Sequence, residues 1–216
     1  MLGNGVAEST IVLLRLLLVE ESTVPPALHA RMRSLILEYT VVGGMPDAVQ
    51  SFVDARDVSK ALSIQRDIVR GHEDDMVKYA PSADKPLIKQ CFKSIPRQLA
   101  KENKKFQYSF VKKGSTASRF AGSLQWIEDA GITLRCRNLS ITDLPLDGNA
   151  LEGQFKVYMA DTGLFTSMLE DGTQFDILNG DLLGYKGGRV RESHRRRVFQ
   201  DGEGVVLLPE RLGTRA

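Results

Sequence analysis

Cationic side chains dominate one stretch of the chain, from Lys85 to Arg119, in which the single acid is Glu102. Lysine and arginine can neutralise phosphates, which gives an affinity for nucleic acid that depends on salt and little on base sequence. Charge alone also fits a solvated helix face or a protein-docking surface, so these alternatives stay open at this point. If nucleic acid is the partner, we expect five of these side chains to contact phosphates: Lys104, Lys105, Lys112, Lys113 and Arg119.

A second group with chemical potential is the run from His72 to Asp75, which places one histidine beside three acids. Imidazole and carboxylate groups are metal ligands. Adjacent residues on a helix point in different directions, however, and cannot converge on one ion. A solvated acidic turn is therefore the favoured interpretation, and no metal site is predicted.

Two glycine-containing segments resemble parts of known sites. Gly43-Gly44 could cradle a phosphate, but the segment lacks the lysine and hydroxyl of a phosphate loop, so a tight structural turn is favoured. Asp161 precedes Thr162-Gly163 without a second acid or base nearby in the sequence. We therefore expect Asp161 to cap the next helix rather than to catalyse a reaction.

Three short helices and a strand are predicted to position the basic stretch. Pro96, with Ser94 before it as a cap, is predicted to begin the second helix, and Gly131 to end the third. Residues 132–137 then alternate between apolar and polar, as in a half-buried strand. This order is typical of a winged helix-turn-helix, whose third helix would be the candidate for reading a groove. The apolar residues recur at helical spacing over residues 88–92, 95–106 and 120–127.

The flanking sequence is also mostly helical in pattern. Pro46 is predicted to start one of its helices, and residues 153–159 alternate as a strand. The predicted fold is therefore mainly α with a small β component, beginning with a helical bundle. Helices are expected at residues 1–22, 27–39, 47–53 and 57–79.

Composition sets broad limits. The 216 residues allow one or two domains, and the overall net charge is only +2, so a basic face would be local. Cys91 and Cys136 each lie on an apolar face, which favours buried thiols over a disulfide. The apolar run near the start is too short to span a bilayer and lacks a cleavage pattern, so we expect a cytoplasmic protein without a membrane partner.

Five segments together resemble the domain-of-unknown-function 4143 family (DUF4143), which follows the nucleotide-binding domain of predicted AAA-type ATPases. The segments are YTVVGGMPDAV, IQRDIVRGHEDDMVKYA, SIPRQLAKENKKFQYSFVKKG, LQWIEDAGI and FKVYMADTGLF. The resemblance implies a helical linker, a winged helix and then a restriction-endonuclease-like α/β domain. It also implies an ATPase domain as a partner in the full-length architecture.

The resemblance divides the chain into four parts. Neither a phosphate loop nor an acidic magnesium ligand of the ATPase is found in this sequence, so we expect no ATP binding by this chain alone. Likewise, the nuclease-like domain would be incomplete. The predicted parts are a helical linker or bundle at 1–80, a winged helix at 81–146, the start of the nuclease-like domain at 147–186, and a frameshifted or disordered tail at 187–216.

The tail hypothesis comes from composition. All 12 lysines lie at or before Lys186, whereas residues 187–216 contain seven arginines and no lysine. Read one nucleotide later, the possible codons permit a Glu-Asn helix and a Leu-Tyr-Tyr-Phe strand like those of the family. The alternative is a genuine arginine-rich tail, and the nucleotide sequence would decide between them.

Taken together, these patterns predict a non-catalytic fragment of an AAA-type ATP-binding protein, without cofactor or metal, whose winged helix binds DNA. The alternative function is a regulatory docking module for the missing ATPase domain, without nucleic-acid binding.

Overall fold

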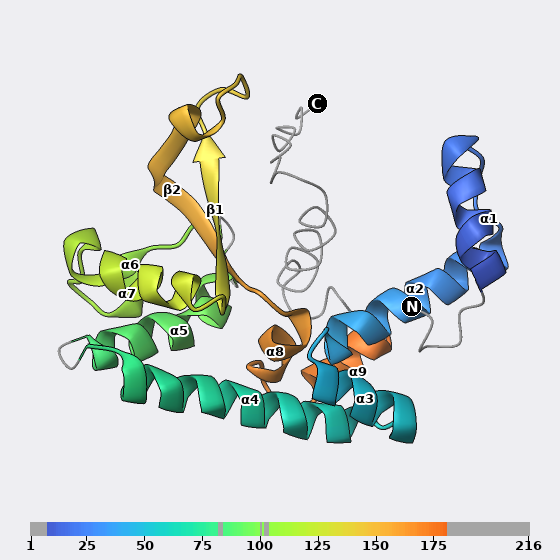
Figure 1. Ribbon diagram of the computed structural model, residues 1–216, viewed down its shortest axis with the longest axis horizontal. Coiled ribbons are helices and arrows are strands. Elements are labelled where there is room, and N and C mark those ends of the chain that lie inside the picture. Colours follow the sequence, from blue (N-terminus) through green and yellow to red (C-terminus); the bar gives the residue numbers. More distant parts are fainter. Residues whose placement is uncertain (1–7, 82–83, 100, 102–103, 181–216) are drawn as a thin grey trace. The chain divides into compact units, whose positions relative to one another are not determined.

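The computed structural model describes residues 8–81, 84–99, 101 and 104–180 (Figure 1). The described part is mainly helical with one small antiparallel sheet of two strands. It divides into two compact units: unit 1 comprises residues 8–75 and 161–180, and unit 2 comprises residues 76–160. The chain therefore leaves unit 1, forms unit 2, and returns to complete unit 1.

Unit 1 consists of helices from both ends of the described chain. Its core contains Val42, Ala48, Phe52 and Ala61, which come from three successive helices. Pro46 occupies the first turn of α3, as predicted from the sequence, because its missing N–H has no partner in that turn anyway. The elements are α1 (Glu8–Val19), α2 (Pro26–Val42), α3 (Pro46–Ala55), α4 (Val58–Tyr79, whose last turn belongs to unit 2), α8 (Thr162–Ser167) and α9 (Thr173–Leu178).

Asp161 joins the two sequence-distant parts of unit 1. Its carboxylate accepts a hydrogen bond from the N–H of Gly44 at 2.7 Å and another from the N–H of Leu164 at 2.8 Å. Gly43 has φ +71°, and a side chain there would lie 2.3 Å from the Asp161 carboxylate. The turn at the glycine pair thus accommodates an internal carboxylate, and the predicted capping role of Asp161 is confirmed.

Gln65 makes a second link inside unit 1. Its side-chain amide donates to the carbonyls of Val41 and Val42 at 2.9 and 2.8 Å, at the C-terminal end of α2. Gly163 lies against this amide so closely that an added methyl group would be 2.5 Å from Gln65 Nε2. Unit 1 is therefore held together by hydrogen bonds between side chains and backbone, and the absence of a side chain at Gly43 and Gly163 leaves room for them.

Unit 2 packs three helices against a β-hairpin. α5 (Lys85–Leu99) packs on α7 (Ala117–Asp129) and on β2 (Ala150–Met159), and α6 (Tyr108–Val111) packs on α5. β1 (Thr133–Leu139) pairs with β2 in antiparallel register from Thr133↔Met159 to Leu139↔Ala150. A 3-10 turn, η2 (Asp147–Asn149), precedes β2. The core of this unit is built from Phe92, Ile95, Phe120, Leu124 and Tyr158, each at most 1% exposed.

The predicted helix break at Pro96 is wrong. α5 continues through Pro96 to Leu99, and the second helix is the four-residue α6 instead. Proline in a helix interior removes a hydrogen bond. That loss falls near the C-terminal end of α5, where Ile95 and Leu99 remain fully buried on the apolar face of the helix. The free energy gained by burying this apolar face outweighs the tendency of proline to interrupt a helix. Gly131 does adopt φ +71° after α7, as predicted for a helix C-terminus.

The fold prediction has a coarse part, the class of fold, and a finer part, the assignment to named folds. The coarse class, mainly helical with a small sheet, is confirmed. The winged-helix and nuclease-like assignments, and the predicted ranges 1–80, 81–146 and 147–186, are not decided by these elements alone. The tail at 187–216 lies outside the described residues. Within the described part, no helix is both long and apolar enough to cross a membrane.

Candidate nucleic-acid interface

The two units carry opposite charge. Unit 2 contains 14 lysines and arginines against seven acids, whereas residues 8–75 and 161–180 of unit 1 contain seven cations against 15 acids. The net charge of the whole chain is only +2, so it does not reveal this difference between the units. Residues 161–180, which contain four acids and no cation, add to the acidic excess of residues 8–75 because they belong to the same unit. A polyanion would be attracted to unit 2 and repelled by unit 1.

The turn between α6 and α7 presents three of the five predicted phosphate contacts. Lys112 and Lys113 are exposed in this turn, and Arg119 is exposed in the first turn of α7. Gly114, with φ +78°, reverses the chain, and Ser115 N–H donates to the Lys112 carbonyl at 3.0 Å. The local fold therefore places three cations within eight consecutive residues, 112–119, around the start of α7.

Lys104 and Lys105 have a different environment. Both side chains are half-buried in the segment between α5 and α6, directly before the buried Phe106. The Phe106 ring stacks on Phe155 of β2 with centroids 5.7 Å apart, and its N–H donates to the Phe155 carbonyl at 2.9 Å. Both lysines take part in interactions within the chain. They are thus less available to a phosphate than the lysines of the turn.

A cluster around Phe110 was not identified from the sequence. The Arg97 guanidinium donates to the Phe110 carbonyl, and Lys101 Nζ lies 3.3 Å from the centroid of the Phe110 ring. Lys101 also donates to Gln98 Oε1 at 3.2 Å. Partial burial lowers the pKa of Lys101, and the neighbouring Arg97 lowers this pKa further. No motif signals this contact, because it depends on how α6 folds back on α5.

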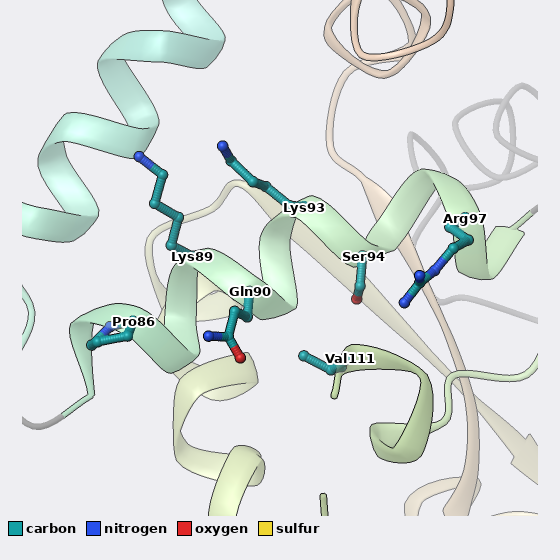
Figure 2. Close-up of a pocket in the computed structure, with 7 residues that line it drawn as sticks. All are labelled: Pro86, Lys89, Gln90, Lys93, Ser94, Arg97 and Val111. Atoms are coloured by element: carbon teal, nitrogen blue, oxygen red, sulfur yellow. The ribbon is translucent and has the colours of Figure 1, made fainter. Parts of the chain in front are cut away.

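An open groove of about 520 Å³ runs along α5 (Figure 2). Lys89, Lys93 and Arg97 line it at intervals of four residues, and Val111 of α6 supplies an apolar wall. In Figure 2, Arg97 extends toward the side of α5 on which Val111 lies, whereas Lys89 and Lys93 extend to the other side. The groove is therefore edged by cations and partly apolar inside.

The exposed surface of α7 and the loop of the hairpin differ in chemistry. The first two turns of α7 expose small side chains, namely Ala117, Ser118, Ala121 and Gly122. Such residues would allow close approach of another molecule. The loop between β1 and β2 contains Asp143 and Asp147 and no cation. Phosphates would be repelled by this loop.

Metal binding and thiol chemistry depend on how His, Cys, Asp and Glu side chains are arranged and buried. No three His, Cys, Asp or Glu side chains within them are arranged to hold a metal ion. Burial lowers the pKa of His72, against the opposing effect of Asp75. Burial also raises the pKa of the Cys91 thiol to about 12, so its thiolate is scarce at neutral pH.

These features define a class: a mainly helical protein of two units, one of which combines three helices and a hairpin with a cation-rich surface. The chain belongs to the family described as Domain of unknown function (DUF8612), whose model matches residues 33–174. The match spans both units. Neither the curated proteins nor the solved structures contain a match to the chain.

The resemblance to DUF4143 is therefore corrected, because the family that matches is DUF8612. Several residues behind that resemblance have structural roles here. Gly43, Gly44, Asp161 and Gly163 form the junction of unit 1. Such packing residues do not by themselves identify a family. With the resemblance withdrawn, the expected ATPase partner and the nuclease-like domain lose the argument on which they rested.

Proposed function

We propose that unit 2 is a nucleic-acid-binding module of winged-helix type, which contacts the phosphate backbone of duplex DNA through the turn between α6 and α7. The observation that carries the proposal is the exposure of Lys112 and Lys113 in the turn before α7 and of Arg119 in its first turn. The order of α5, α6, α7, β1 and β2 supports the fold assignment, since a winged helix has three helices followed by a hairpin.

The charge distribution supports the same proposal. Unit 2 has twice as many cations as acids, whereas unit 1 has the opposite excess. Long-range attraction would orient unit 2 toward DNA, and the exposed cations of the turn would then pair with phosphates. α7 is about 20 Å long at 1.5 Å per residue. Its small exposed residues would allow the helix to lie close to the duplex.

The hairpin loop is left out of this contact. Asp143 and Asp147 would face phosphates of like charge, which is unfavourable. Specific reading of bases also has little support, because α7 exposes only Arg119 and Gln125 as long polar side chains capable of donating to base edges. The proposed affinity is therefore largely independent of base sequence.

Fluorescence anisotropy of a labelled DNA duplex tests the proposal. The wild-type chain is expected to bind at low salt, and Lys112→Ala combined with Lys113→Ala to bind at least about tenfold more weakly. Arg15→Ala combined with Lys60→Ala is the matched control, because it removes the same charge from exposed positions of unit 1. Absence of binding, or an equal loss in the control, would refute the proposal.

A protein-docking role is the second candidate, and α1 favours it. None of its residues is buried, and Leu16, Leu18 and Val19 are 52, 80 and 82% exposed. An exposed apolar helix of this kind is typical of an interaction site. If α1 is such a site, Leu16→Lys with Leu18→Lys should reduce binding of a hydrophobic dye and raise solubility while leaving DNA binding intact.

A further inference from the structure

The loop that connects β1 to β2 has the chemistry of a protein-docking element. Leu144 is 85% exposed and Ile141 is 52% exposed. Asp143 and Asp147 flank Leu144, Ile141 lies two residues before Asp143, and residues 140–149 contain no cation. Exposed apolar side chains beside acids suit a basic, partly apolar protein surface and do not suit a phosphate backbone.

Hydrogen bonds hold this loop in one shape. Ser140 donates to the Asn149 carbonyl through its N–H at 2.9 Å and through its hydroxyl at 3.1 Å. The Asn149 side chain donates to the carbonyls of Asp143 at 2.8 Å and Pro145 at 3.3 Å. Because the loop is already ordered, docking would cost little conformational entropy.

The groove on α5 has the complementary chemistry. Lys89, Lys93 and Arg97 line it, and successive cations are about 6 Å apart along the helix axis. Arg97 donates to the Phe110 carbonyl, and Lys89 and Lys93 also take part in interactions within the chain. A guanidinium has five N–H donors and an ammonium has three, so each of these groups can bind a carboxylate as well. Val111 and Pro86 supply apolar surface in the same groove.

The loop of one chain does not face the groove of that chain. α5 packs near the start of the hairpin, and the two strands carry the loop away from it (Figure 1). Seven residues of β1 correspond to about 23 Å of extended chain. The occupant that brings both surfaces together is therefore a second copy.

We propose that the loop around Leu144 of one copy docks in the α5 groove of a second copy. Leu144 covers Val111. One of the two flanking acids, Asp143 or Asp147, pairs with Arg97 on the same side of α5, and the other reaches Lys93 at the opposite edge of the groove. The two surfaces differ, so the contact is head-to-tail and can continue from copy to copy. A contact made by a single loop of ten residues, 140–149, buries little surface and is therefore weak. Its charge pairs make it sensitive to salt.

Sedimentation velocity of the full chain, without nucleic acid, tests this proposal. The wild-type chain should form species larger than a dimer as concentration rises, and less so as salt is raised. Leu144→Asp and Lys93→Glu should each weaken association about tenfold or more. Both residues are exposed, and circular dichroism would verify that each variant is folded. An equimolar mixture should form dimers and nothing larger, because one variant keeps its groove and the other its loop.

Two controls separate this contact from other causes of association. Lys60→Glu makes the same charge change on unit 1, and Leu18→Asp removes an exposed apolar side chain from α1. Both should associate like the wild-type chain. A monomer at every concentration, a loss of association in Leu18→Asp alone, or mixed variants that stay monomeric would overturn the proposal. If Lys93→Glu weakens DNA binding while association is unchanged, the groove serves nucleic acid and the proposal is also overturned.

Discussion

Replacing Asp161 with Ala removes the carboxylate that joins the two parts of unit 1. The Leu164 N–H lies in a fully buried environment, so leaving it without an acceptor costs about 1–3 kcal/mol. The Gly44 N–H is partly accessible, and water can replace the carboxylate there at a cost of about 1 kcal/mol. We therefore expect Asp161→Ala to lower the free energy of unfolding by about 3 kcal/mol.

Chemical denaturation followed by circular dichroism measures this change. Asp171→Ala is the matched control, because the Asp171 side chain is 89% exposed and forms a surface ion pair with Arg66 at 2.5 Å. Such a pair contributes about 0–1 kcal/mol. Trp126, the single tryptophan, lies in unit 2, so its fluorescence reports whether the loss is confined to unit 1. If Asp161→Ala is as stable as the control, the proposed role of the carboxylate is wrong.

Three further predictions concern single residues. Gly163→Ala would place a methyl group 2.5 Å from Gln65 Nε2 and 2.6 Å from the Val42 carbonyl, so the free energy of unfolding should fall by about 1–3 kcal/mol. Gly71→Ala is the control: a methyl group there meets nothing within 4 Å, and because Gly71 lies inside α4 this change should raise the free energy of unfolding by about 0.5–1 kcal/mol. Cys91 and Cys136 are buried and the pKa of Cys91 is raised to about 12, so neither thiol should react with a thiol reagent at neutral pH until the chain unfolds; rapid labelling of the native chain would contradict this. Burial lowers the pKa of His72 in the folded state below its unfolded value of 6.5, so the unfolded state binds more protons as the pH drops. The free energy of unfolding should therefore fall as the pH drops through and below 6.5, and this decrease should be smaller in His72→Gln. Equal pH profiles of the free energy of unfolding for the two proteins would contradict the lowered pKa.

Local features could be predicted from the sequence where one cause dominates. Pro46 starts a helix, Gly131 ends one, and Asp161 caps one, because each role depends on the residue and its immediate neighbours. The alternation near Phe155 likewise predicted a strand, which the structure contains as part of β2. Apolar periodicity predicted the longer helices for the same reason.

Other features depend on tertiary structure and could not be predicted in this way. Pro96 was expected to end a helix, but burial of Ile95 and Leu99 keeps α5 continuous. The bond between Gly44 and Asp161 joins residues 117 positions apart. The groove on α5 requires Val111 to lie against it, which depends on the fold of α6.

The candidate site was predicted only in part for the same reason. Lys112, Lys113 and Arg119 are exposed together, whereas Lys104 and Lys105 are half-buried between α5 and α6. A list of cations does not distinguish these environments. The full acidic excess of unit 1 also depends on the fold, because it includes the four acids of residues 161–180.

Phosphate binding by unit 2 can be measured through the salt dependence of its DNA affinity. Each phosphate contact contributes about 0.9 to the slope of log affinity against log salt concentration. If unit 2 binds the phosphate backbone, the slope should be steep and negative for the wild-type chain, shallower by about two for Lys112→Ala with Lys113→Ala, and unchanged for Arg15→Ala with Lys60→Ala. Equal slopes for all three proteins, or an affinity independent of salt, would contradict phosphate binding by unit 2.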